Sequence, residues 1–127
     1  MQNRLNNRFK DLKNIIQRLN FSLLNVYPET KSVLAETHLV DDNKNIWCWS
    51  EESFSGVLNG YFPVTLKFID RVKGNYIRIS GKAFVEDKSA QIAALEDADN
   101  KQSLLRIEML QIVWYYKKTG KVKFYSC

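Results

Sequence analysis

Carboxylates, two cysteines and one histidine are the side chains of this sequence that could do chemistry. Asp41-Asp42 and Glu51-Glu52 are adjacent acidic pairs, but both fall in segments with turn composition, where solvated charge is the usual role. Cys48 and Cys127 lack the paired spacing of a zinc or redox site, so we expect a buried small residue and a free terminal thiol. His38 has no second histidine with which to share a metal ion. No phosphate-binding glycine loop or hydrolase motif is present, and we expect no metal site.

Aromatic side chains are the second notable set, because there are more of them than a core of this size needs. Core packing is the default explanation, and a flat-ligand pocket or a subunit interface is the alternative. The set comprises Trp47, Trp49, Phe62, Phe68, Tyr76, Trp114, Tyr115 and Tyr116. Near the C-terminus, Tyr115 and Tyr116 are followed by four lysines at positions 117, 118, 121 and 123, a mixture typical of single-stranded nucleic-acid binding. A solvated hairpin explains that mixture equally well.

Composition indicates a globular protein with one hydrophobic core. The chain has 127 residues, of which 45% are hydrophobic and 26% charged, and a single domain over residues 1–127 is expected. Its net charge of +5 should attract anionic groups such as phosphates. The first residues have no apolar signal-peptide core, and no run approaches the roughly 20 apolar residues of a membrane span. We therefore expect a cytoplasmic protein without a membrane partner.

An amphipathic helix is predicted at the N-terminus, ending at Asn20. Apolar residues recur there at spacings of three and four, at Leu5, Phe9, Leu12, Ile15, Ile16 and Leu19. A short second helix is expected near residues 88–97, where Asp87 and Ser89 can cap it. Between and after the helices the apolar period changes to two. This change predicts strands at 21–26, 31–40, 45–50, 64–72, 76–86, 104–116 and 121–125.

The alternation along these strands predicts which residues share a face. One face of the second strand should carry Val33, Ala35, Thr37 and Leu39, and one face of the fifth should carry Ile77, Ile79, Gly81, Ala83 and Val85. Gly81 and Ala83 are small, which suggests a bend or the close approach of another backbone. Six or seven short antiparallel strands with flanking helices predict a mostly β fold, either a small barrel or a sandwich.

Four segments, in this order, carry a family resemblance. They are LLNVYPE at 23–29, DDNKNIW at 41–47, FPVTL at 62–66 and IRISGKAFVED at 77–87. Their order and spacing resemble the pyridoxamine 5'-phosphate oxidase-like, FMN-binding split-barrel family, and its general-stress-protein branch is the closest in length. The resemblance implies a split β-barrel that forms a homodimer and holds FMN at the subunit interface.

The resemblance also implies which residues would hold the cofactor. Ser50 and Ser53 keep hydroxyls on the phosphate side, and Trp114 matches an aromatic position at the pocket or interface. The family's phosphate-binding arginine falls near Ala35, and its lysine falls on Ser55 or Gly56, so both cations are replaced. We expect this loss to weaken FMN binding unless another lysine substitutes; Lys67 is the first choice, and the others are Lys31 and Lys82.

The sequence leaves three hypotheses for the function: two use the split barrel, and the third does not depend on it. The first is an FMN-binding flavoprotein, a flavin-dependent oxidoreductase if it turns over, because a bound flavin carries the redox chemistry without a protein acid or base. The second is a homodimer that binds no cofactor or binds another small anionic ligand. Nucleic-acid binding is the third and weakest hypothesis.

Overall fold

A computed structural model describes residues 2–26, 32–51, 60–86 and 103–126 of the chain. Within these residues one helix precedes seven strands, and all paired strands are antiparallel. The elements are α1 (Gln2–Leu19), β1 (Phe21–Val26), β2 (Ser32–Val40), β3 (Asn45–Ser50), β4 (Phe62–Asp70), β5 (Asn75–Val85), β6 (Ser103–Tyr115) and β7 (Val122–Ser126).

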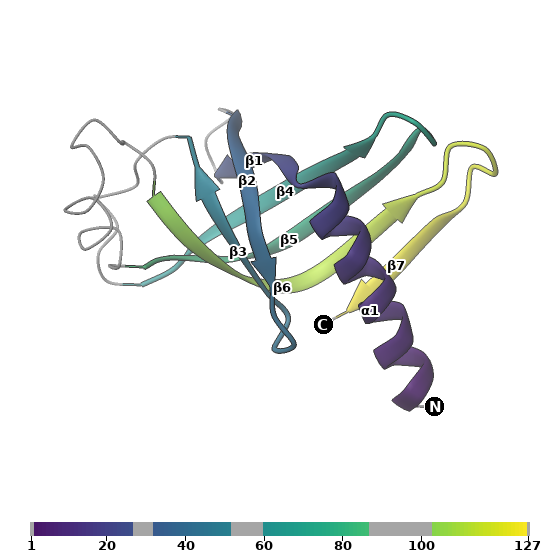
Figure 1. The fold of residues 1–127 in the computed structure, drawn as a ribbon, viewed down its shortest axis with the longest axis horizontal. Helices are drawn as coiled ribbons and strands as arrows, with labels where there is room; N and C mark the ends of the chain where they lie inside the picture. Colours follow the sequence, from purple (N-terminus) through teal and green to yellow (C-terminus); the bar gives the residue numbers. More distant parts are fainter. Residues whose placement is uncertain (1, 27–31, 52–59, 87–102, 127) are drawn as a thin grey trace.

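Six of the strands close into a barrel. Their order is β3-β2-β1-β4-β5-β6, and pairing of β3 with β6 closes the ring, while β7 extends β6 beyond it (Figure 1). The predicted split barrel of six or seven antiparallel strands with an N-terminal amphipathic helix is therefore confirmed. The helix expected near 88–97 lies outside the described residues. The single domain over residues 1–127 stays a prediction.

The core fills the inside of the barrel because inward and outward residues alternate along each strand. On β3, Ile46 and Cys48 are buried while Trp47 and Trp49 lie on the opposite side, as predicted. On β4 and β5 the predicted inward residues are likewise buried, except that Val85 at the end of β5 is only partly buried, and Leu66, Phe68, Ile77 and Ile79 are each at most 1% exposed. Burial of each such apolar side chain stabilises the fold by roughly 1.5–3 kcal/mol relative to leaving it exposed.

The predicted face of β2 is wrong at its end. Val33, Ala35 and Thr37 are buried as expected, but Leu39 is 38% exposed and Val40 is 1% exposed. The pairing of β2 with β3 shifts its register between Thr37 and Leu39, so one extra residue bulges out of the ladder. A bulge of one residue exchanges the two faces of the strand beyond it, and Val40 therefore takes the core position that Leu39 was expected to fill.

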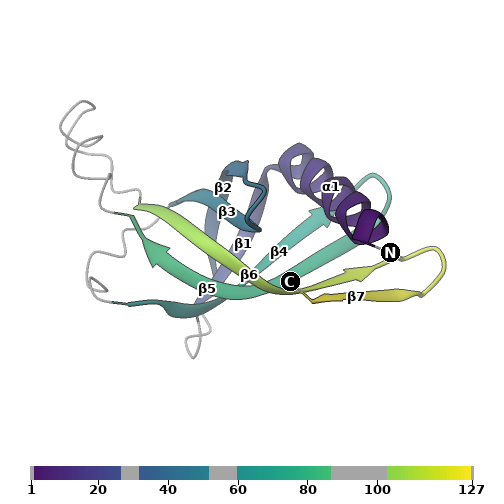
Figure 2. The same cartoon turned by 90° about the horizontal axis from the view of Figure 1, so that it is seen from below.

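Helix α1 lies along the side of the barrel and joins directly to β1 (Figure 2). It buries Phe9, Leu12 and Ile16 against the core, as its apolar stripe predicts. Asn20 ends the helix as expected: its φ is 65°, and its N–H donates to the Ile16 carbonyl over 3.0 Å. No helix in the described segments is long and apolar enough to cross a bilayer.

Gly81 marks the place where β5 and β6 come unusually close. A Cβ built on Gly81 would lie 2.5 Å from the Glu108 carbonyl oxygen, well inside contact distance. The ladder between the two strands also shifts its register between Ser80 and Gly81. The predicted close approach of a second backbone at this glycine is confirmed.

Candidate functional site

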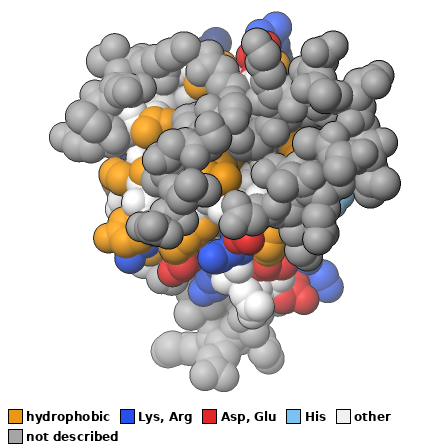
Figure 3. Space-filling model, turned by 90° about the vertical axis from the view of Figure 1, so that its left-hand side faces the viewer, with side chains coloured by type: hydrophobic (Ala, Val, Ile, Leu, Met, Phe, Trp, Pro, Cys, Tyr) orange, Lys and Arg blue, Asp and Glu red, His pale blue; other side chains and the backbone are white. Residues whose placement is uncertain are grey.

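Ser50 and Trp114 lie too far apart to contact one ligand within a single chain. Ser50 ends β3 with its side chain fully buried, and it pairs with Ser103 at the start of β6. The last part of β3 and the start of β6 lie at the left-hand end of the barrel in Figure 1, the side that faces the viewer in Figure 3. Trp114 lies 11 residues further along β6, or about 35 Å of strand. Ser53 falls outside the described residues. The two residues therefore do not form one site within the chain.

Lys67 instead lies beside a second cation on the outer surface of the barrel. Lys67 of β4 and Arg78 of β5 are direct ladder partners, and both point outward because their neighbours Leu66 and Ile77 face the core. Neither side chain forms an ion pair with a carboxylate of the described residues. The Nε of Arg78 is buried and has no hydrogen-bond partner there. We call Lys67 and Arg78 the outer cation pair.

Hydroxyl and aromatic groups of β4, β5 and β6 flank the outer cation pair. Thr65 and Ser80 pair on one side of it. On the other side, Tyr76 of β5 stacks on Tyr115 of β6 with ring centroids 4.5 Å apart and planes inclined by 8°. Cations, hydroxyls and a flat aromatic surface are the groups that bind a phosphate joined to a ring system.

Tyr76 keeps its proton at neutral pH. Burial raises its pKa, and the nearby Tyr115 raises it further, while the positive charge of Arg78 acts in the opposite direction. The phenol is therefore a hydrogen-bond donor beside the outer cation pair, and it adds no negative charge to it.

Exposed apolar side chains adjoin the outer cation pair on the β1 side. Leu23 of β1 pairs with both Lys67 of β4 and Leu34 of β2, so these residues form one row across three strands. Leu23, Leu34, Phe21 and Ile69 are between 40% and 53% exposed. We call these four residues the outer apolar patch, and a patch of this kind is typical of an interaction surface.

The expected position of the family's arginine gives no cation at this surface. Ala35 is completely buried and faces the core. Its neighbours on β2, Leu34 and Glu36, point outward, and neither is basic. Lys31, one of the possible substitutes, lies outside the described residues.

Two other outward cations near these strands, Lys82 and Arg106, already have partners. Lys82, the third candidate substitute, lies over the Tyr61 ring with its Nζ 4.6 Å from the centroid. Arg106 lies 4.3 Å from the Phe84 centroid and donates to Glu86 over 2.9 Å. These contacts distinguish both residues from the outer cation pair.

Asp41 and Cys48, two further candidates for chemistry, have structural roles, whereas Glu52 and Cys127 lie outside the described residues. Asp41 accepts hydrogen bonds from the backbone N–H groups of Asn43 and Asn45 and from the Trp47 indole. Burial acts to raise the pKa of Asp41, but these hydrogen bonds hold it below its usual value. Burial raises the pKa of the Cys48 thiol to about 12, so this cysteine is not a nucleophile. The described residues contain no group of three metal-ligating side chains.

The aromatic and basic residues near the C-terminus do not form one surface. Tyr115 stacks on Tyr76 on the outside of the barrel, whereas Tyr116 stacks on Trp114, whose ladder partner Ile77 faces inward. A single-stranded nucleic acid needs a continuous row of stacking side chains. This division between two faces counts against the nucleic-acid hypothesis.

The sequence reasoning did not single out Arg78, although the apolar alternation along its strand predicts that its side chain points outward. Outward residues on two adjacent strands are candidates for a cross-strand pair. The actual partners depend on register, which the turn between the strands sets. Asp70 and Asn75 close this turn, and it places Gly74 at a φ of 73°. Pairing Lys67 with Arg78 follows from that geometry.

No protein-family model matches the sequence, and no curated protein matches it. Solved structures do share its fold. A Clostridium acetobutylicum protein related to general stress protein 26 of B. subtilis, of the pyridoxinephosphate oxidase family, superposes with a TM-score of 0.69 and 13% identity over 95% of both chains. General stress protein 26 from Bacillus anthracis str. Sterne gives 0.56 and 14%, over 91% of this chain and 98% of that one.

A third similar structure is the general stress FMN/FAD binding protein from Xanthomonas citri, with a TM-score of 0.55 and 13% identity over 92% of this chain and 89% of that one. At these identities the likeness concerns the fold. It confirms, at that level, the resemblance to the split-barrel family that the order of sequence segments predicts.

Proposed function

We propose that this chain binds FMN as a homodimer, with the phosphate of FMN on the outer cation pair. The observation that carries the proposal is the pairing of Lys67 with Arg78, without a carboxylate partner in the described part of the chain. Like charges directly opposite each other in a ladder destabilise a sheet. A phosphate dianion between them would turn this repulsion into two charge-assisted hydrogen bonds.

The groups beside the outer cation pair fit the rest of such a ligand. Thr65 and Ser80 offer hydroxyls to the phosphate or to a sugar-alcohol chain. Tyr76 and Tyr115 offer a stacked aromatic surface to a flavin ring. The buried Nε of Arg78 has no acceptor among the described residues, and a phosphate oxygen would supply one. The residues present therefore fit a phosphorylated flavin.

The outer apolar patch supports the homodimer. Phe21, Leu23, Leu34 and Ile69 expose a large part of their side chains next to Lys67. A second subunit packed over them would bury this apolar surface and exclude water from the neighbouring cations, which strengthens their hold on a phosphate.

Bound FMN would supply the redox chemistry, as the acceptor and donor of a hydride or of single electrons. The chain would bind and orient the cofactor, and Tyr76 would donate a hydrogen bond from its neutral phenol. We propose an oxidoreductase role in the cytoplasm on this basis. The free Cys48 is compatible with a reducing compartment.

FMN titration followed by flavin fluorescence tests the proposal. Lys67→Ala and Arg78→Ala should each raise the Kd for FMN about tenfold or more, as expected when one charge-assisted hydrogen bond is lost. Lys82→Ala is the matched control, since it removes the same charge from an outward position on β5, and it should change the Kd less than twofold. Riboflavin lacks the phosphate, so its weaker binding should be the same in all four proteins.

Two results would contradict the phosphate site. One is FMN binding that Lys67→Ala and Arg78→Ala leave unchanged, and the other is wild-type protein that does not bind FMN at all. The second result would favour a homodimer that holds another small anionic ligand or none. Sedimentation velocity tests the dimer separately: Leu23→Asp should give monomers, whereas Leu110→Asp, an exposed leucine outside the patch, should not.

A further inference from the structure

A cavity lies between α1 and the hairpin of β6 and β7, on the side of the sheet opposite to the outer cation pair. Its volume is about 570 Å³, which is within the usual range of small-ligand sites. Leu12 and Ile15 line it from the helix, and Ile112 lines it from β6. Most of the exposed lining is thus apolar, as in most sites for organic ligands.

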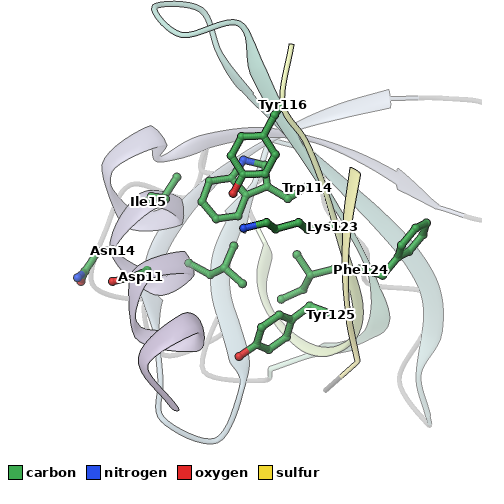
Figure 4. Close-up of a pocket in the computed structure, with 10 residues that line it drawn as sticks. Asp11, Asn14, Ile15, Trp114, Tyr116, Lys123, Phe124 and Tyr125 are labelled. Atoms are coloured by element: carbon green, nitrogen blue, oxygen red, sulfur yellow. The ribbon is translucent and has the colours of Figure 1, made fainter. Parts of the chain in front are cut away.

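One cation reaches the middle of this cavity. Lys123 of β7 is the ladder partner of Trp114, and its side chain extends toward α1 between Tyr116 and Tyr125 (Figure 4). The Nζ lies 5.4 Å from the centroid of the Tyr116 ring. Lys123 forms no ion pair within the described segments. An ammonium group in these surroundings favours a ligand with a negative charge.

The aromatic lining favours a ligand with a ring. Trp114 and Tyr116 stack with centroids 4.9 Å apart and planes inclined by 17°. The indole Nε1 of Trp114 is buried and has no hydrogen-bond partner in the described part of the chain. Burial also raises the pKa of Tyr116, so its phenol remains a neutral donor. An acceptor group and a flat apolar body would both find partners here.

The charges around the cavity limit how negative the ligand can be. Besides Lys123, the only charged side chain among its lining residues is Asp11 of α1. A monoanion can place its charge on Lys123, away from this carboxylate. A dianion such as the phosphate of FMN finds only one cation here, whereas the outer face offers two.

We propose that this cavity is a second ligand site, separate from the flavin site, and that it binds a small aromatic monoanion such as an aromatic carboxylate or sulfonate. Lys123 holds the acidic group, and Trp114 and Tyr116 pack against the ring. The two sites use opposite faces of the sheet, so either can exist without the other.

The test uses the fluorescent aromatic monoanion 8-anilinonaphthalene-1-sulfonate and its uncharged relative N-phenyl-1-naphthylamine. Lys123→Met should raise the Kd for the sulfonate about tenfold or more and change the Kd for the neutral probe less than twofold. Lys121→Met is the matched control, because Lys121 is exposed on the same hairpin and carries the same charge. It should leave both Kd values unchanged.

The indole N–H resonances in a nitrogen–proton NMR spectrum locate the bound sulfonate. The Trp114 resonance, assigned through Trp114→Phe, should shift during the titration, and those of Trp47 and Trp49 should not. Equal Kd values for the wild type and Lys123→Met, or shifts confined to Trp47 and Trp49, would overturn the proposal. Displacement of the sulfonate by FMN would overturn the separation of the two sites. Absence of FMN binding would leave the cavity proposal intact.

Discussion

Lys67 and Arg78 face each other across the ladder of β4 and β5 on the outer surface of the barrel, and neither has a carboxylate partner in the described segments. Most cations on a protein surface are stabilised by a nearby carboxylate or by solvent. Here the Arg78 Nε is buried without an acceptor, and a second positive charge lies next to it. Such an arrangement lowers the stability of the free protein and is compensated when an anion binds.

Removal of one of these charges should therefore stabilise the free protein. We expect Lys67→Gln to raise the free energy of unfolding by about 0.2–1 kcal/mol, the usual effect of a cross-strand charge pair. Urea denaturation without phosphate measures the change. Lys118→Gln, in the turn after β6, controls for the lower net charge and should have little effect. A loss of stability in Lys67→Gln would show that the two cations do not repel each other.

Gly81 permits the close contact of β5 with β6, and a methyl group there has no space. Gly81→Ala would place a Cβ against backbone atoms of Glu108, so the strands must separate. Overpacking of this kind costs about 1–3 kcal/mol. Urea denaturation should show this loss, while Ser80→Ala on the adjacent outward position should change the stability by less than about 0.5 kcal/mol. Equal stability of the two variants would mean that the strands can move apart freely.

The strand positions could be predicted from the sequence because one face of almost every strand is buried. The bounds of β1 and β3 agree with the predicted 21–26 and 45–50, since apolar alternation and polar turns define both ends. Gly81 could be predicted as a point of contact because glycine in a strand interior usually has a steric reason. Leu39 could not be placed correctly, because a bulge leaves no mark in the apolar pattern.

The candidate sites depend on contacts between strands that the sequence pattern does not give. Lys67 and Trp114 were chosen from the resemblance, but they lie on opposite faces of the sheet, and alternation within each strand does not relate one strand to another. Arg78 gains its importance only from the register of β4 against β5, which depends on the turn between them. The cavity beside Lys123 requires the packing of α1 against β6 and β7, a contact between the two ends of the chain.

Cys48 should make the stability of the barrel depend on pH in alkaline solution. Burial raises the pKa of its thiol from 9.0 to about 12, so the folded state keeps a proton that the unfolded state loses above pH 9. The contribution of this group to stability is complete below pH 9 and is lost as the pH rises toward 12. Between pH 8 and pH 10 we expect the free energy of unfolding to fall by about 1.4 kcal/mol from this group.

Urea denaturation of the wild type and of Cys48→Ala at both pH values isolates the effect, because tyrosine and lysine titration is common to both proteins. The variant should be less stable at pH 8 and should lose less stability by pH 10. Parallel curves for the two proteins would show that the Cys48 thiol ionises as readily in the folded state as in the unfolded one.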